Sequence, residues 1–296
     1  MATYRIVVLG DSVNWGQGLE TEEKFYSMVQ ASIPDAESVL LAHSGATIGV
    51  GTPPTEAQVD GEVPTAYPTI LQQCDAFNDA PETVDLVLVN GGINDINIRF
   101  IINPLTDSAH LKDSTRLHCF QGMKTLLENV AAKFSKPSAR IIVTSYYPIL
   151  SHQTHVPLIE AFLAMQGLAL PPFLDLLDGL VFAKIIANCE QFYTQSNHFL
   201  QRAINQVNAA VGGIPRIFFA QPPFGPENAA LAPQAWLWGV NPDLSPQDPV
   251  QAARHIACDA FETDIIRRQT CYRASAGHPN IQGAQQYALA ILALLS

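Results

Sequence analysis

Five short runs of β-branched and aliphatic residues, separated by stretches with helical character, dominate this sequence. Each run is almost continuously apolar, which is typical of strands that are covered on both faces. The runs are Arg5 to Leu9, Ser38 to Ala42, Val84 to Val89, Arg140 to Thr144 and Arg216 to Ala220. Helices are expected at Glu22 to Ser32, Pro68 to Asn78, Thr115 to Phe134, Asn197 to Ala210 and Ile281 to Leu295.

The alternation of strands and helices predicts an α/β fold, with a parallel sheet that has helices on both faces. Five strands suit a flavodoxin-like, doubly wound order, so we expect a three-layer αβα sandwich around a five-stranded parallel sheet. Ligand sites of such sheets form beyond the carboxyl ends of the strands. The functional loops should therefore lie at that edge.

The 296 residues are expected to form one domain with helical and loop insertions. Two intervals, 49–67 and 150–197, are longer than a plain crossover needs. The second is rich in Leu, Phe and Ala and predicts a cap insertion that lines an acyl pocket, because ligand pockets are largely apolar. Two ordinary amphipathic helices packed on the core would explain the same residues.

The charge of the chain limits its partners. A formal net charge of −11 argues against nucleic acid, which requires clustered Lys and Arg. The longest apolar neighbourhood, Leu158 to Ile186, is interrupted by charges and prolines, so no transmembrane segment is expected. The first residues carry no export signal. The chain is expected to be soluble, and either cytoplasmic or secreted with its signal removed; nothing in the sequence indicates an oligomeric state.

The five cysteines show neither CxxC spacing nor a Cys/His cluster, so we expect no metal and no cofactor. Cys258 and Cys271 lie close enough in sequence to close a small loop. Free thiols in a reducing compartment and a disulfide in an exported protein are equally compatible with this spacing.

The first predicted strand ends in Gly10-Asp11-Ser12. A serine between the carboxyl end of a strand and a helix exposes its hydroxyl near backbone N–H groups that favour negative charge. Ser12 is therefore a candidate nucleophile, although a helix cap would explain the same residue. We interpret Asp11, and likewise Asp95, as structural residues that hold their loops.

Two candidate hydrogen-bond donors follow the next two strands. An acyl-transfer site needs donors aimed at the developing oxyanion. The backbone N–H of Gly45 and the side-chain amide of Asn94 meet this need, whereas taken singly each residue could serve only turn geometry.

A candidate general base stands just before the last predicted helix, in the segment Gly277-His278-Pro279-Asn280. A histidine in that loop can reach a serine hydroxyl across the ends of the strands, and can act first as a base and then as an acid.

Together, these pieces resemble the SGNH/GDSL hydrolase family (GDSL-type esterases and lipases), which is named for a Ser, a Gly, an Asn and a His on separate blocks. The blocks occur here in order as Gly10-Asp11-Ser12, Ser44-Gly45, Gly92-Ile93-Asn94-Asp95 and Gly277-His278-Pro279-Asn280. The resemblance implies that Ser12 attacks the ester and that His278 transfers the proton. It also implies an oxyanion hole made by the N–H groups of Ser12 and Gly45 and the amide of Asn94.

The last block departs from the family pattern DxxH, because Ser275 stands where the pattern has an aspartate. We expect a Ser-His dyad in which a backbone carbonyl of Ser275 or Ala276 orients the histidine ring. A carboxylate from the preceding segment is the alternative, with three candidates: Asp259, Glu262 and Asp264.

The sequence thus predicts a serine ester hydrolase that cleaves carboxylic esters, acyl or lipid, through an acyl-enzyme intermediate. An acyltransferase or a carbohydrate deacetylase would use the same groups. A non-catalytic flavodoxin-like binding module is an alternative of another class, but neither GxGxxG nor GxxxxGK[ST] is present to support it.

Overall fold

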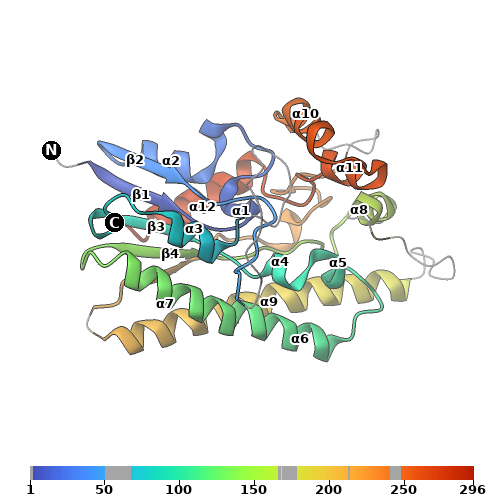
Figure 1. The fold of residues 1–296 in the computed structure, drawn as a ribbon. Coiled ribbons are helices and arrows are strands. Elements are labelled where there is room, and N and C mark those ends of the chain that lie inside the picture. The colour runs from blue at the N-terminus through green and yellow to red at the C-terminus, as the bar shows by residue number, and fades with distance from the viewer. Residues whose placement is uncertain (1–2, 51–67, 166–167, 169–178, 213, 241–247) are drawn as a thin grey trace.

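The computed structural model of the protein describes residues 3–50, 68–165, 168, 179–212, 214–240 and 248–296. Figure 1 shows a central sheet between two layers of helices. The five strands are parallel and have the order β2-β1-β3-β4-β5. The predicted three-layer fold with a flavodoxin-like strand order is therefore confirmed.

The strands lie within two residues of their predicted positions at either end. They are β1 (Tyr4–Val8), β2 (Ala36–Leu40), β3 (Leu86–Val89), β4 (Arg140–Thr144) and β5 (Ile217–Ala220). All four residues of the central strand β3 are buried, whereas β2, at the edge of the sheet, alternates between half-buried and exposed residues. The continuous apolar runs therefore mark the middle of the sheet, where both faces are covered.

Helices cover the two faces of the sheet in separate groups (Figure 1). On one face lie α2 (Phe25–Ala31) and α12 (Ile281–Leu292), which pack against each other. The other face carries α3 (Ile70–Ala76), α6 (Ser108–Arg116), α7 (Met123–Lys133) and α9 (Gly179–Val211). Short helices follow two strands at their carboxyl ends: α1 (Ser12–Trp15) after β1, and α4 (Ile93–Ile96) and α5 (Ile98–Ile101) after β3.

Two helices are longer than predicted. The helix expected from Thr115 begins at Ser108, and a π-helical turn at Leu117–Gly122 joins α6 to α7. The helix expected from Asn197 begins at Gly179. The added turns bury apolar side chains at helical spacing, among them Val181, Ile185, Cys189 and Phe192. This spacing is hard to recognise in the sequence because most residues of the region are apolar.

The described part of the predicted cap at 150–197 contains three elements. They are the 3-10 turn Val156–Leu158, α8 (Ile159–Met165) and the first turns of α9. Residues 166–167 and 169–178 of the cap, which include Pro171 and Pro172, lie outside the described residues, as do 51–67 of the first long interval. The cap remains a prediction.

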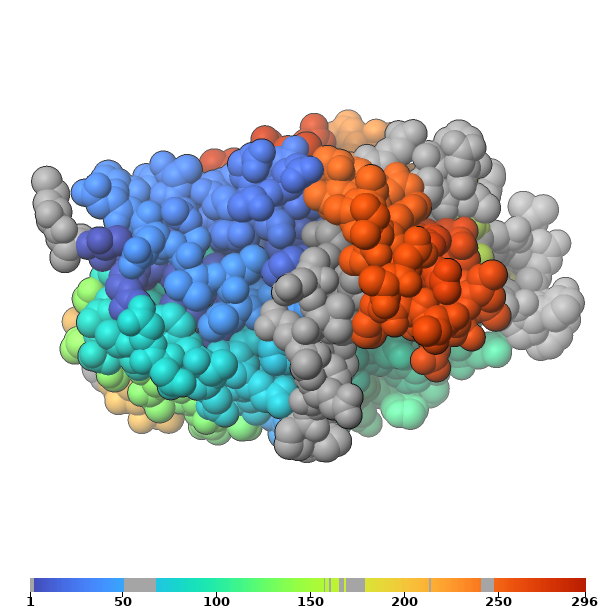
Figure 2. Space-filling view, turned by 45° about the horizontal axis from the view of Figure 1, so that its top comes forward, coloured from blue at the N-terminus to red at the C-terminus, as the bar shows by residue number. Residues whose placement is uncertain are grey.

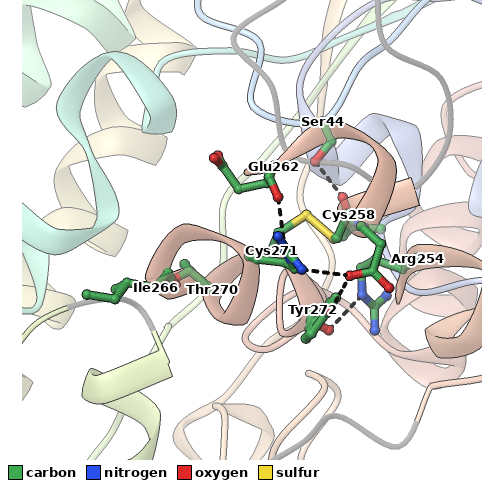
Figure 3. The surroundings of a disulfide bond; sticks show 11 residues. Ser44, Arg254, Cys258, Glu262, Ile266, Thr270, Cys271 and Tyr272 are labelled. Carbon is green, nitrogen blue, oxygen red and sulfur yellow. Dashed lines mark hydrogen bonds and ion pairs between the residues drawn. A yellow bond between two sulfur atoms is a disulfide. The ribbon is translucent and has the colours of Figure 1, made fainter. Parts of the chain in front are cut away.

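Helices α10 (Gln251–Phe261) and α11 (Ile265–Tyr272) form a hairpin that lies on the surface beside the N-terminal part of the chain (Figure 2). A disulfide between Cys258 and Cys271 joins the two helices, with Cα atoms 5.9 Å apart, and Arg254 and Tyr272 lie next to it (Figure 3). The disulfide answers the question that the sequence left open. The other three cysteines are buried free thiols: Cys74, Cys119 and Cys189.

In the described part of the chain, no helix combines the length and the hydropathy that crossing a membrane requires.

Candidate active site

Ser12 is the first residue of α1, directly beyond the carboxyl end of β1. Gly10 makes the sharp turn between them possible. Its φ is +141°, and a Cβ at this position would overlap the side-chain oxygen of Asn90. A side chain at position 10 would therefore displace the backbone that carries the serine.

Asp11 is fully buried and holds this turn through three acceptor contacts. Its carboxylate accepts hydrogen bonds from Val13 N (2.9 Å), Asn90 Nδ2 (2.8 Å) and the hydroxyl of Tyr146 (3.0 Å). Burial raises the pKa of Asp11 to about 6, against the opposing effect of these donors. The carboxylate thus ties the loop to neighbouring strands, which is the structural role inferred from the sequence.

Tyr146, directly after β4, is a residue that the sequence analysis missed. Besides donating to Asp11, its hydroxyl accepts the backbone N–H of Ile93 (3.0 Å) and so links the first block to the third. Nothing local in the sequence indicates this, because Tyr146 and Asp11 are 135 residues apart.

The candidate oxyanion donors lie in the two adjoining loops. Asn94 is half-buried in α4, and its side-chain nitrogen donates to the carbonyl of Ala46 at 3.0 Å, which leaves its second amide hydrogen for a ligand. Gly45 precedes Ala46 and has φ +78°. Neither the Ser12 nor the Gly45 backbone N–H donates a hydrogen bond within the described residues, so both are available donors.

His278 meets Ser12 at the end of β1. Its Nε2 lies 2.7 Å from Ser12 Oγ, a distance at which the hydroxyl can donate to an unprotonated ring nitrogen. The loop before α12 is held by a pair of backbone bonds with Trp238: Trp238 N donates to His278 O, and Gly277 N donates to Trp238 O, both at 2.7 Å. The structure therefore brings together the two residues that the sequence proposes as nucleophile and base.

The surroundings of the His278 ring favour its neutral form. The pKa of His278 is lowered to about 4, chiefly by burial; the positive charge of Arg254 acts in the same direction, and the backbone carbonyl groups of Ser275 and Ala274 act in the opposite one. Within the described residues, buried Nδ1 has no hydrogen-bond partner of regular geometry, although the carbonyl groups of Ser275 and Ala274 act on the pKa of the ring. The Ser275 carbonyl, proposed as the group that orients the ring, accepts the backbone N–H of His278 at 2.9 Å.

The carboxylates considered as alternative partners make contacts within the helical hairpin. Asp264 caps α11 by accepting from Ile266 N and Arg267 N, Glu262 accepts from Asp264 N, and Asp259 accepts from the hydroxyl of Tyr272. None of these contacts involves His278. Ala276, the other residue proposed to orient the ring, lines the pocket next to the histidine.

A small pocket opens beside Ser12, Asn94 and His278. Its volume is about 70 Å³. Apart from these three residues its wall is mostly apolar, with Val13, Ile93, Ile98, Tyr147, Ile149, Phe162, Ala276 and Gly277. Phe162, from α8, also contacts the histidine loop, because a Cβ on Gly277 would lie 3.1 Å from its ring. The pocket can therefore hold a short apolar group next to the serine hydroxyl.

The lowered pKa of His278 leads to a testable pH dependence. A base must be unprotonated, so we expect kcat/KM for a soluble ester to be retained as the pH falls through 6.5 and to reach half its maximum at about pH 4. Circular dichroism at each pH would check that the protein stays folded. The pKa of Asp11 is raised to about 6, so protonation of Asp11 could also change kcat/KM in this pH range. Measuring the same pH profile for Asp11→Asn separates the effect of Asp11 from that of His278. A half-maximum near 6.5 in both proteins would contradict the expectation.

Among the described residues, no group of three or more His, Cys, Asp or Glu side chains gathers as a metal site would require.

Comparison with known proteins supports the fold. No protein-family model matches the chain, and no curated protein matches it. The fold is similar to that of an extracellular lipase from Streptomyces rimosus, with a TM-score of 0.55, 17% identity and coverage of 100% of both chains. It is also similar to a lipase from a goat rumen metagenome, with a TM-score of 0.50, 13% identity and coverage of 98% of this chain and 97% of the other. The chain therefore shares the fold of these two lipases, and its resemblance to the SGNH/GDSL hydrolase family rests on the four sequence blocks.

Proposed function

We propose that this protein is a serine ester hydrolase for which Ser12 is the nucleophile and His278 the general base. The observation that carries the proposal is the 2.7 Å contact between His278 Nε2 and Ser12 Oγ at the wall of an apolar pocket. The similarity to two structures described as lipases supports ester chemistry. A purely structural serine would have no need of a neutral histidine at its hydroxyl.

In the proposed first half-reaction, Ser12 Oγ forms a bond to the carbonyl carbon of the ester while His278 Nε2 takes the hydroxyl proton. The carbonyl electrons move to the oxygen, which accepts from the N–H groups of Ser12 and Gly45 and the amide of Asn94. When the tetrahedral intermediate collapses, the C–O bond to the alcohol breaks. His278 gives its proton to the leaving alcohol, and the acyl group stays on Ser12.

In the second half-reaction, water attacks the acyl-Ser12 ester while His278 accepts a proton from it. The new tetrahedral intermediate releases Ser12 Oγ, which regains the proton from His278, and the free acid departs. An alcohol in place of the water would make the same chain an acyltransferase, and an acetylated sugar as the ester would make it a carbohydrate deacetylase.

The size of the pocket supports a short acyl chain. Its 70 Å³ is less than half the roughly 150 Å³ of a cavity that holds benzene. Five of its apolar side chains, Ile93, Ile98, Tyr147, Ile149 and Phe162, would surround the acyl group next to Ser12. We therefore propose carboxylic esters of short aliphatic acids as the substrate class.

The test is hydrolysis of p-nitrophenyl esters from acetate to octanoate. We expect the wild-type protein to prefer the short esters. Phe162→Ala should raise kcat/KM for hexanoate relative to acetate by about 10-fold or more, because a single methylene that an apolar pocket accepts or excludes is worth about 1–3 kcal/mol. Phe134→Ala is the matched control, since Phe134 is equally buried but lies outside the pocket.

Three outcomes of this assay bear on the proposal. An unchanged chain-length profile of Phe162→Ala would contradict the assignment of the acyl pocket. Added alcohol that diverts the acyl group into a new ester would favour an acyltransferase, and sugar acetates that react faster than aryl esters would favour a deacetylase. Absence of turnover on every ester would refute the proposed activity and favour the non-catalytic alternative.

A further inference from the structure

A buried ion pair lies behind the loop that carries His278. Arg254, from α10, and Asp248 have fully buried side chains. The pair is bidentate: Nη1 donates to Oδ1 at 3.0 Å and Nη2 to Oδ2 at 2.6 Å. A buried pair of this kind contributes little net stability compared with apolar side chains of similar size, although loss of one partner is costly. Its presence therefore calls for a reason other than stability.

Each member of the pair contacts the segment that leads to His278. Ser275 Oγ donates to Asp248 Oδ2 at 2.6 Å. Arg254 Nε donates to the carbonyl of Tyr272 at 2.9 Å (Figure 3). Ser275 in turn accepts the backbone N–H of His278 at 2.9 Å through its carbonyl. Ser275 thus links the ion pair to the backbone of the histidine: its hydroxyl bonds Asp248 and its carbonyl bonds His278.

Ser275 also packs against Gly18, in the loop that follows Ser12 and α1. Gly18 has φ +86°, and a Cβ at this position would overlap Ser275 Cβ and the indole of Trp238. Ser275 is fully buried between this glycine and Asp248. Its position therefore fixes the spacing between the loop after Ser12 and the loop of His278.

We propose that Asp248 and Arg254 are positioning residues for the ester hydrolysis proposed above, and that they act through Ser275 to hold His278 Nε2 against Ser12. They replace a carboxylate bound directly to the imidazole, which the loop lacks because position 275 is a serine. The inference rests on the proposed function, since a base needs this alignment only if it takes a proton.

The first test is Ser275→Ala, which removes the hydroxyl and leaves the ion pair intact. Misplacement of a catalytic group by a fraction of an ångström to 1 Å costs up to 100-fold in rate, so we expect kcat to fall about 10-fold or more while KM changes less than 2-fold. The rate at which a fluorophosphonate labels Ser12 should fall by the same factor. In that reaction the Oγ–P bond forms, fluoride leaves and His278 takes the proton.

The matched control is Thr115→Val, which also removes one hydroxyl that is fully buried. Thr115 Oγ1 donates to the carbonyl of Leu111 at 2.7 Å within α6. This hydrogen bond does not involve the loop of His278. This variant should lose stability without loss of kcat or labelling rate. If Ser275→Ala melts cooperatively and keeps wild-type kcat, or if the control loses as much kcat, the positioning role is wrong.

A second variant covers the case in which Ser275→Ala does not fold. Asp248→Leu/Arg254→Met replaces the ion pair by apolar side chains, an exchange that buried pairs commonly tolerate. We expect a folded protein with kcat lowered at least as much as in Ser275→Ala. Adding Ser275→Ala to it should cost less than 2-fold more, because all three residues act along one path. Wild-type kcat in the apolar pair variant would overturn the proposal.

Failure of the proposed function can be told apart from failure of this inference. If the wild-type protein hydrolyses no ester but Ser12 is labelled, the ester hydrolase proposal fails and the labelling rates still decide the positioning role. If Ser12 is not labelled at all, both fail.

Discussion

Ser12→Ala should lower kcat/KM for every ester that the wild-type protein hydrolyses by about 10⁴-fold or more, because loss of a serine nucleophile removes the covalent route altogether. What remains would be the contribution of binding and of the oxyanion donors. Steady-state hydrolysis of p-nitrophenyl acetate measures the loss, and intact-protein mass spectrometry after fluorophosphonate treatment should show one adduct on the wild-type protein and none on the variant.

Ser145→Ala is a matched control for this experiment. Ser145 is a fully buried serine directly after β4, and within the described residues its hydroxyl has no hydrogen-bond partner. Its removal should leave kcat/KM within about 3-fold of wild type. If Ser12→Ala keeps activity within 10-fold of wild type and still takes up the label, Ser12 is not the nucleophile, and the 2.7 Å contact with His278 has another purpose.

His278→Ala should lower kcat/KM by about 10³- to 10⁴-fold, since the hydroxyl of Ser12 then has no base to take its proton. The remaining activity should increase with hydroxide concentration, without the half-maximum near pH 4 expected of the wild-type protein. The measurement is the same ester assay between pH 4 and 9.

His198→Ala provides the comparison for the histidine variant. His198 is an exposed residue of α9 whose ring packs edge-on against Phe199, far along the chain from the proposed site. We expect its kcat/KM and its pH profile to equal those of wild type. A loss smaller than 10-fold in His278→Ala, with the fold intact, would mean that another group activates the serine.

The sequence pattern predicts the sheet well because burial on both faces leaves a continuous apolar run. The helices are predicted less well. Helix α9 begins at Gly179, in a stretch whose apolar composition suggested an insertion, and the side chains of these first turns extend the buried face of the helix. The four blocks proposed to be catalytic were recognisable because each stands where a predicted strand ends or the last helix begins. Such positions can be identified from the local sequence, without knowledge of distant contacts.

The groups that support those blocks could not be predicted in the same way. Asp248 and Ser275 are 27 residues apart, and Tyr146 and Asp11 are 135 apart, so no local spacing joins them. One signal was available: an arginine in the otherwise mostly apolar helix α10, at the position whose side chain is buried. A buried cation needs a partner, which points to a carboxylate nearby in the fold without saying which one.

The two atoms of the proposed proton transfer come from opposite ends of the chain, 266 residues apart. A ribosome therefore makes Ser12 266 residues before His278, and until His278 is made the serine hydroxyl lacks the base proposed for it. The contact between His278 and Ser12 forms only after α12 has packed and its loop lies over the end of the first strand. Ester hydrolysis would thus indicate that the whole sheet has folded. Partial unfolding near Ser12 or near His278 would abolish it.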